Sequence, residues 1–211
     1  MIGIVDYGAG NLRSVEFALD ELRVDHRRVS GPDGLADVDR VILPGVGAAE
    51  SAMRELRRRD LVQALRETRR PLLGICLGMQ LLVESSDEGG EKVRCLGLIP
   101  GRTRRIDTDA PLPHIGWNRI EPAGDEEPLF RGIPGEDGGD DAEDGGFHCY
   151  FLHGHRVRCD ERYVRGRAEY GERFPAAIRA GRVAGLQFHP EKSGPVGLRM
   201  LSNFCHPKET P

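Results

Sequence analysis

The sequence predicts a single α/β domain with a parallel sheet core flanked by helices and a mixed or antiparallel extension in its second half. Apolar segments alternate with amphipathic helical segments through about the first 85 residues, a pattern typical of parallel α/β sheets. Glycine-rich turns follow these apolar segments, and β-rich pieces with short connections dominate the remainder. A chain of 211 residues is long enough to bury one core and short for two.

Strand, turn and helix follow one another three times in the first half of the chain. The first apolar run ends at Asp6, and after a glycine-containing turn Asn11 occupies the N-cap position of a helix. The second run ends at a Pro-Gly-Val-Gly turn, residues 44–47, and the third leads into the segment Gly-Ile-Cys-Leu-Gly, residues 74–78. The predicted strands are residues 2–5, 40–43 and 71–75, and the predicted helices are residues 12–22, 48–59, a further one from residue 60, and 77–84.

We expect the β-rich pieces of the second half to extend the same sheet, and a final amphipathic helix to follow them. The pieces are near residues 102–107, 113–120, 147–159, 163–170 and 176–189, and the helix spans about 196–204. Residues 134–146 contain six acidic residues and five glycines, too little apolar surface to offset the entropy of ordering. We therefore predict one domain over residues 1–206, with a mobile acidic insertion at 134–146 and a tail at 207–211.

The composition argues against several classes of function. The net charge is −4, with 30 Lys and Arg against 34 Asp and Glu, which gives no general reason to bind nucleic acid or an anionic membrane. The longest apolar stretch, residues 72–83, contains glycines and is shorter than the roughly 20 residues of a membrane helix. The N-terminus lacks the features of a secretory signal, and five cysteines without a C-x-x-C pair indicate reduced thiols. We predict a cytoplasmic protein.

Cys76 is the candidate nucleophile. It stands between an apolar strand and a helix, with a glycine two residues away on either side, which is the pattern of a nucleophile elbow. Such a turn exposes the side chain, and the adjacent helix N-terminus favours the thiolate form. The competing interpretation is a buried structural cysteine at a glycine-containing strand end.

Two other segments complete the candidate site. The turn at residues 44–47 ends a neighbouring strand, where the N–H groups of Val46 and Gly47, with that of Leu77, can stabilise an oxyanion. His189 and Glu191 flank a proline, and a histidine oriented by a carboxylate is the general base that a cysteine nucleophile needs. A lone His-Pro-Glu is more often a surface turn, so the argument depends on all three segments together.

These residues resemble the class I glutamine amidotransferases, in which an elbow cysteine and a His-Pro-Glu segment form the triad. Cys76, His189 and Glu191 occupy the triad positions, and Gln80 matches a residue that helps to hold glutamine. Within that family, the sequence resembles the glutaminase subunits of imidazole glycerol phosphate synthase. The segments that carry this second resemblance are residues 6–15, 44–47, 113–118 and 190–193.

The resemblance implies hydrolysis of L-glutamine through a cysteine thioester, without cofactor or metal. It also implies that ammonia passes to a cyclase subunit with a (β/α)₈ barrel, as a one-to-one heterodimer that makes imidazole glycerol phosphate and an aminoimidazole carboxamide ribonucleotide. The glutamine site would use Gly45, Gly47, Gln80, His153, Gly154 and His155, and the partner interface or ammonia gate would use Asn11, Trp117 and Lys192. His153-Gly154-His155 departs from the family pattern His-Ser/Thr-Tyr, and the insertion at 134–146 has no evident counterpart.

Several alternatives remain open from the sequence. Cys149, His153 and His155 share parity on one predicted strand and could bind a metal. The basic run at residues 102–105 could meet a phosphate, although solvated faces carry such runs routinely. The other functions considered are a catalytically silent relative, an elbow-cysteine hydrolase or redox sensor, and the glutaminase subunit of pyridoxal phosphate synthase. The last would be expected to carry Gly-Gly-Glu-Ser where this chain has Gly-Val-Gly-Ala, residues 45–48.

Overall fold

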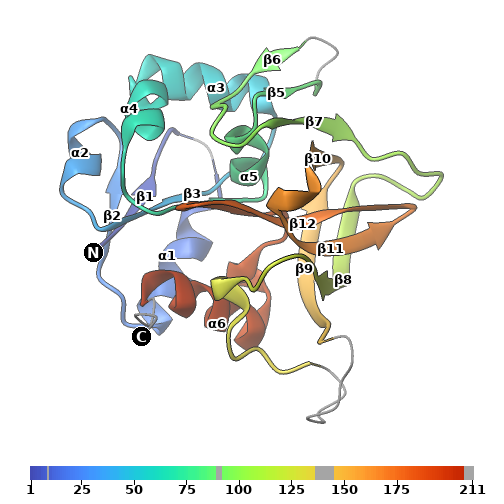
Figure 1. The fold of residues 1–211 in the computed structure, drawn as a ribbon. Coiled ribbons are helices and arrows are strands. Elements are labelled where there is room, and N and C mark those ends of the chain that lie inside the picture. Colours follow the sequence, from blue (N-terminus) through green and yellow to red (C-terminus); the bar gives the residue numbers. More distant parts are fainter. Residues whose placement is uncertain (9, 89–91, 136–144, 207–211) are drawn as a thin grey trace.

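The computed structural model describes residues 1–8, 10–88, 92–135 and 145–206, which form two sheets with helices on both faces of the larger one (Figure 1). The predicted insertion at 134–146 lies mostly outside the described residues, and the predicted tail lies wholly outside them. The nine-stranded sheet has the order β2-β1-β3-β4-β13-β12-β11-β8-β9, and the four-stranded sheet has the order β10-β7-β5-β6.

The strands of the nine-stranded sheet are β1 (Ile2–Val5), β2 (His26–Val29), β3 (Arg40–Leu43), β4 (Leu72–Ile75), β8 (His114–Pro122), β9 (Phe147–His153), β11 (Val164–Tyr170), β12 (Glu172–Ala180) and β13 (Val183–Leu186). Those of the four-stranded sheet are β5 (Ser85–Ser86), β6 (Val93–Arg94), β7 (Gly101–Arg105) and β10 (His155–Cys159). The helices are α1 (Leu12–Glu21), α2 (Asp33–Ala36), α3 (Ala49–Arg58), α4 (Leu61–Glu67), α5 (Leu77–Leu82) and α6 (Gly194–Cys205), with 3-10 turns η1 (Pro128–Phe130), η2 (Glu161–Tyr163) and η3 (Pro190–Lys192).

The predicted parallel core is confirmed, and it is larger than the three strands identified from the sequence. Strands β2, β1, β3, β4 and β13 pair in parallel, whereas β12, β11, β8 and β9 continue the sheet in antiparallel fashion. The sequence did not predict β2, because its residues His-Arg-Arg-Val form a polar edge strand without an apolar run. The predicted helix at 77–84 ends at Leu82, since Ser85 and Ser86 pair as strand β5.

The second half differs from the prediction in two places, where single predicted strands are in fact two. Residues 176–189 contain the end of β12 and a separate strand β13, which turns back to pair with β4. Residues 147–159 divide at Gly154: His153 pairs with His114 of β8, whereas His155 pairs with Arg105 of β7. The chain therefore passes from one sheet to the other at one residue, and the expectation that all β-rich pieces extend the same sheet was wrong.

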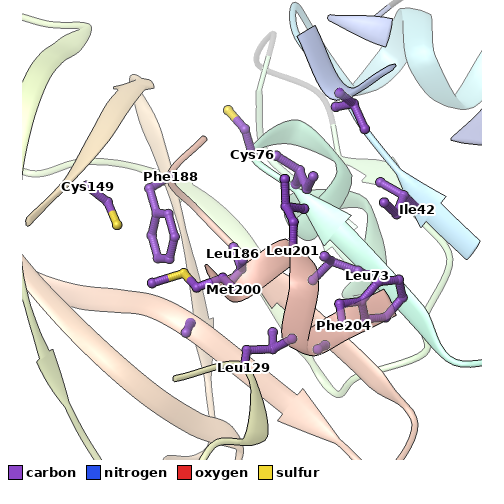
Figure 2. Packing of buried hydrophobic residues seen from close by; sticks show 14 of the residues in the cluster. Ile42, Leu73, Cys76, Leu129, Cys149, Leu186, Phe188, Met200, Leu201 and Phe204 are labelled. Carbon is purple, nitrogen blue, oxygen red and sulfur yellow. The ribbon is translucent and has the colours of Figure 1, made fainter. Parts of the chain in front are cut away.

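Both faces of the parallel strands are buried. Leu73 belongs to a cluster shared with α1 and α6, while its neighbour Leu72 belongs to a cluster with α3, α4 and α5. The first cluster includes Leu186, Leu201 and Phe204, which lie together beneath the sheet (Figure 2). This double burial explains why the central strands are continuous apolar runs without alternation. None of the helices among the described residues is both long and apolar enough to cross a membrane.

Candidate active site

Cys76 forms the predicted elbow between β4 and α5. Its backbone has a φ of 53°, a region that side-chain-bearing residues rarely adopt, and strain of this kind is concentrated at functional sites. The close passage of strand and helix requires both flanking glycines. A Cβ on Gly78 would lie 1.8 Å from the carbonyl oxygen of Leu43, and one on Gly74 would lie 2.7 Å from the backbone of Gly78. The prediction that small residues permit this turn is therefore confirmed.

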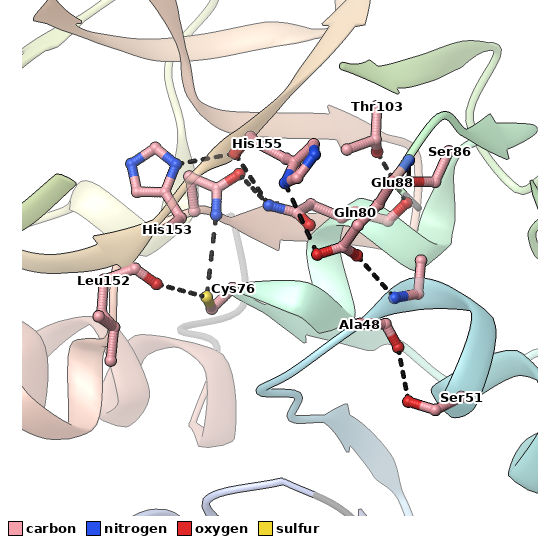
Figure 3. A network of polar contacts seen from close by, with 12 residues as sticks. Ala48, Ser51, Cys76, Gln80, Ser86, Glu88, Thr103, Leu152, His153 and His155 are labelled. Atoms are coloured by element: carbon pink, nitrogen blue, oxygen red, sulfur yellow. Dashed lines mark hydrogen bonds and ion pairs between the residues drawn. The ribbon is translucent and has the colours of Figure 1, made fainter. Parts of the chain in front are cut away.

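The thiol of Cys76 faces a narrow pocket. The residue is 5% exposed, and its thiol donates to the carbonyl oxygen of Leu152 at 3.5 Å (Figure 3). The Nε2 of Gln187, in the segment that leads from β13 to His189, approaches the sulfur at 3.9 Å. The Cys76 N–H donates to the carbonyl oxygen of Leu186 at 2.7 Å, so main-chain pairing between β4 and β13 sets the position of the elbow.

His189 and Glu191 form a buried pair at the start of η3. The Nδ1 of His189 lies 2.8 Å from Glu191 Oε1, and both side chains are 1% exposed. A carboxylate can only accept, so Nδ1 carries a proton and Nε2 is the basic nitrogen of the neutral ring. This Nε2 is buried and has no hydrogen-bond partner among the described residues. Asn11, at the N-cap position of α1, makes no capping bond with its side chain and instead donates to Glu191 Oε1 at 3.3 Å.

The electrostatic surroundings favour a charged His189. Burial by itself lowers the pKa of the imidazole, but the neighbouring Cys76 sulfur and the hydrogen-bonded Glu191 carboxylate outweigh it and raise the pKa to about 10. The backbone holds the ring in place. His189 N–H donates to Tyr150 O at 2.9 Å, and the Ser193 hydroxyl donates to His189 O at 2.7 Å. A cationic imidazole beside the sulfur is the arrangement that stabilises a thiolate.

A pocket of about 110 Å³ contains most of the predicted site. Its walls are formed by Val46, Gly47, Cys76, Leu77, Gln80, Glu88, Leu152, His153, Gly154 and His155. The predicted oxyanion residues and four of the predicted glutamine-binding positions outside the 44–47 turn therefore lie around the thiol. Gly45 does not line the pocket; it packs where a Cβ would lie 2.8 Å from Leu77 Cβ and 2.9 Å from the Tyr7 hydroxyl. A larger hollow, of about 790 Å³, lies on the four-stranded sheet and contains none of these residues.

Glu88 is a pocket residue that the sequence did not reveal. Its Oε2 accepts from the N–H of Ala49 at 2.7 Å, and its Oε1 lies 3.6 Å from Nδ1 of His155 (Figure 3). Glu88 thus ties the first turn of α3, directly after the 44–47 turn, to the opposite wall of the pocket. An acidic residue two positions after a short strand is a weak signal by itself, because most such residues are solvated.

Two buried histidines support the wall formed by residues 152–155. His153 Nδ1 lies 2.8 Å from the carbonyl oxygen of His155, which can only accept, so Nδ1 carries the proton of the neutral ring. The unprotonated Nε2 of His153 therefore accepts from Nδ1 of His114 at 3.2 Å. His114 Nε2 then accepts from Asn118 at 3.4 Å. Burial lowers the pKa of His153 to about 3 and also lowers that of His114, so both rings stay neutral. Gln80 reaches the same junction, because its Nε2 donates to His155 O at 3.0 Å and to Gln187 Oε1 at 3.1 Å.

The metal alternative finds no support in this geometry. Cys149 and His153 are on β9, whereas His155 is on β10 of the other sheet, so they do not share one strand face. Both ring nitrogens of His153 already have partners. Across the described part of the chain, no group of three or more His, Cys, Asp or Glu is arranged to hold a metal ion.

The three predicted interface residues lie beside the segment that carries His189 and Glu191. The Trp117 ring is 58% exposed on β8 and contacts the Tyr150 ring edge-on, with centroids 6.4 Å apart. The Lys192 ammonium lies 5.8 Å from the centroid of the same tyrosine, and Asn11 contacts Glu191. Tyr150, which the sequence did not single out, therefore links the exposed tryptophan to the segment that carries His189.

Comparisons with known proteins agree with this geometry. The family description "Glutamine amidotransferase class-I" matches residues 4–207. Proteins named imidazole glycerol phosphate synthase subunit HisH are similar along the whole chain: that of Carboxydothermus hydrogenoformans is 44% identical over 97% of this chain and 98% of its own. That of Idiomarina loihiensis is 46% identical over 95% of each, and that of Bacillus cereus strain AH187 is 43% identical over all of this chain and 96% of its own.

Solved structures share the fold at low identity. A structure described as a glutamine amidotransferase superimposes with a TM-score of 0.72 at 22% identity, covering 96% of each chain. One of PurLQS from Thermotoga maritima gives 0.71 at 19% identity with the same coverage. The chain belongs to the class I glutamine amidotransferase family, in the branch formed by the HisH subunits of imidazole glycerol phosphate synthase.

Proposed function

We propose that this chain is the glutaminase subunit of an imidazole glycerol phosphate synthase, and that Cys76, His189 and Glu191 are its catalytic triad. The observation that carries the proposal is a buried His189–Glu191 pair, joined at 2.8 Å, in a chain that is 43–46% identical to HisH subunits over nearly its full length. The enzyme hydrolyses the side-chain amide of glutamine and supplies ammonia for histidine biosynthesis.

The reaction requires one nucleophile and one proton carrier. The thiol proton of Cys76 passes to Nε2 of His189, a transfer that the raised pKa of His189 favours, and the thiolate sulfur attacks the amide carbon. The imidazolium then protonates the amide nitrogen, whose bond to carbon breaks to release ammonia. Water, deprotonated by the same Nε2, attacks the resulting thioester, and glutamate leaves as the thiol is restored. Glu191 keeps the proton on Nδ1 throughout, so that Nε2 is always the nitrogen that faces the reaction.

The oxyanion of each tetrahedral intermediate needs N–H donors. Leu77 is the first residue of α5, where N–H groups have no partner within the helix. Val46 and Gly47 line the same pocket, and their N–H groups make no hydrogen bond to any of the described residues. Gly47 has a φ of 94°, so the peptide before it can adopt orientations closed to other residues. We assign these three residues to the oxyanion hole.

The pocket walls supply the contacts for the rest of glutamine. Gln80, His153, Gly154 and His155 form one wall, and the carboxylate of Glu88 is the group suited to the substrate's ammonium. Where the family has a hydroxyl and an aromatic ring, Gly154 and His155 leave space and bring an imidazole to 3.6 Å from Glu88. Recognition at this wall therefore relies on the backbone of residues 152–155 and on Glu88.

As a synthase subunit, the chain works with a cyclase partner. We further propose that this partner is a (β/α)₈ barrel bound one to one through Asn11, Trp117 and Lys192, which surround Glu191 and Tyr150. Ammonia would leave past Lys192, on the side of the triad that faces the partner. All five cysteines are free, which supports the cytoplasmic location expected from the sequence.

The test is glutamate formation by the free subunit, by the complex with the cyclase and by the complex loaded with nucleotide substrate. Cys76→Ala should abolish glutamine-dependent synthesis while the complex still works with an ammonium salt, because only the ammonia source is lost. Cys205→Ala is the matched control, since this half-buried thiol ends α6 and does not line the pocket. Glutaminase activity in Cys76→Ala would disprove the assignment of the nucleophile.

A further inference from the structure

A row of arginines crosses the four-stranded sheet. Arg158 of β10 lies directly opposite Arg102 of β7. Ser85 of β5 is the partner of Arg102 on its other side, and Arg94 of β6 is the partner of Ser85. Residues paired directly across neighbouring strands have side chains on the same face of the sheet. The register therefore places three guanidinium groups on one face, with a single serine between them.

This row lines the larger hollow of the molecule, of about 790 Å³. Ser85 is buried, whereas the three arginines are exposed, so the small serine and Gly101 form the floor and the long side chains form the walls. Lys92 adds a fourth cation at the edge. In Figure 1 β5, β6 and β7 lie toward the top of the molecule, and β10 continues from β9 to join them.

The arginines in the next row of the same sheet have carboxylate partners, whereas those of the row from Arg158 to Arg94 do not. Arg104 and Arg156 are also paired across β7 and β10. Arg104 has Asp87 at 3.7 Å, and Arg156 Nε donates to Glu172 at 2.7 Å. The guanidinium groups of Arg94, Arg102 and Arg158 make no hydrogen bond or ion pair within the described residues. The charge of Arg158 acts on Glu172 from a distance, but that carboxylate is already bound by Arg156.

The charges around the hollow are strongly unbalanced. Like charges directly opposite on neighbouring strands destabilise a sheet, so repulsion between Arg102 and Arg158 destabilises the folded state locally. Among the described residues that line the hollow, the one carboxylate is that of Glu84, which accepts from the Gly101 N–H at 3.2 Å, so these residues carry an excess of three positive charges. Burial raises the pKa of the nearby Cys159 thiol to about 11, so the thiol adds no negative charge.

We propose that this hollow is a binding site for a small oligophosphate, of the class of tripolyphosphate or a nucleoside triphosphate. Guanidinium groups bind phosphate oxygens in paired, planar contacts, which compensates the repulsion within the row. Adjacent strands lie about 4.8 Å apart, so the row from Arg158 to Arg94 spans roughly 14 Å at the backbone. That length suits several linked phosphates better than a single one.

The size and charge of the molecule favour a small ligand over a polymer. The hollow has the volume of a pocket for a nucleotide-sized molecule, which is a few hundred to about 1,000 Å³. The net charge of the chain is −4, which provides no general attraction for a polyanion such as a nucleic acid. The site lies outside the glutamine pocket and its test does not depend on glutaminase activity.

The test is calorimetric titration of the full chain with tripolyphosphate, ATP and inorganic phosphate at about 100 mM salt, where long-range attraction is screened. We expect one saturable site for tripolyphosphate or ATP and much weaker binding of phosphate. Arg94→Gln/Arg102→Gln should weaken binding by about tenfold or more. The control Arg54→Gln/Arg69→Gln removes the same charge from two exposed arginines on other elements and should leave the affinity unchanged.

Three outcomes would overturn the proposal. The first is the absence of saturable binding of both oligophosphates at millimolar concentration. The second is equal weakening in the two double variants, which would indicate non-specific attraction to net charge. The third is tighter binding of a short single-stranded oligonucleotide than of ATP through Arg94 and Arg102, which would identify a nucleic-acid surface. Thermal denaturation and glutaminase activity of each variant establish that it is folded.

Discussion

Replacing Glu191 by glutamine removes a negative charge from the proposed triad while it keeps the shape of the side chain. The carboxylate lies 2.8 Å from Nδ1 of His189, and both groups are buried. Two unit charges about 4 Å apart interact by roughly 4 kcal/mol at an effective dielectric constant of about 20, which corresponds to about three pKa units. The pKa of His189, raised to about 10 in the native protein, should therefore fall by up to about three units.

The orientation of the new amide decides how much activity remains. Ser14 donates to Asn11 Oδ1 at 2.7 Å, which turns the Asn11 NH₂ group toward Oε1 of residue 191. A glutamine there keeps its oxygen toward His189, since the reverse orientation would place two NH₂ groups together. Nε2 then remains the basic nitrogen, and the loss is limited to charge. We expect kcat to fall by up to about 10³-fold, the equivalent of roughly 4 kcal/mol, and by less than in His189→Ala.

The assay is glutamate release by the complex, together with NMR titration of the His189 ring. Asn11→Ala alone should reduce activity only slightly, whereas Asn11→Ala/Glu191→Gln frees the amide to turn and should approach the activity of His189→Ala.

A raised histidine pKa stabilises the fold most below the unfolded value of about 6.5 and loses that contribution as pH rises through the folded value. The Tm difference between wild type and Glu191→Gln should therefore shrink between about pH 7 and pH 10. An unchanged His189 titration, or additive effects of the two substitutions, would refute this reasoning.

Three further substitutions test other parts of the structure. Gly78→Ala should destabilise the fold by about 3 kcal/mol or more in urea denaturation, because its Cβ would lie 1.8 Å from backbone oxygen, and an unchanged midpoint would contradict the close passage at the elbow. His114→Phe keeps a ring but removes the donor to His153, so KM for glutamine should rise more than kcat falls; equal losses would indicate general damage. Lys192→Ala should still form the complex but release glutamate without matching synthesis, and fully coupled turnover would remove this lysine from the ammonia path.

Particular strands show how far the fold can be predicted from the sequence. The apolar runs and turn glycines predicted β1, β3, β4 and their helices, because local patterns encode burial directly. The polar edge strand β2 was not predicted, and the breaks at Gly154 and after Ala180 were missed, because one glycine within a β-rich stretch is a weak turn signal. Only pairing partners far along the chain decide where such a strand turns or changes sheet.

Some residues of the candidate site could be predicted from local sequence patterns, and others could not. Cys76 and His189 lie in short segments whose residue types already specify chemistry, so both were proposed from sequence. Glu88, Tyr150 and His114 carry no such local pattern, and their roles come from contacts with residues far along the chain. For Gly45 the sequence motif predicted a contact with glutamine. In the structure the absence of a Cβ at this position allows close packing against Leu77.

The order of strands explains why these distant segments meet at one edge. β4 and β13 are parallel neighbours, with Ile75 paired to Leu186, so Cys76 and the segment leading to His189 leave the sheet side by side. β9 approaches the same edge, where Tyr150 O accepts from His189 N–H at 2.9 Å. These contacts are between backbone groups, which do not depend on side-chain identity. Substitutions in the pocket wall at residues 154 and 155 can therefore leave the elbow and the His189–Glu191 pair in place.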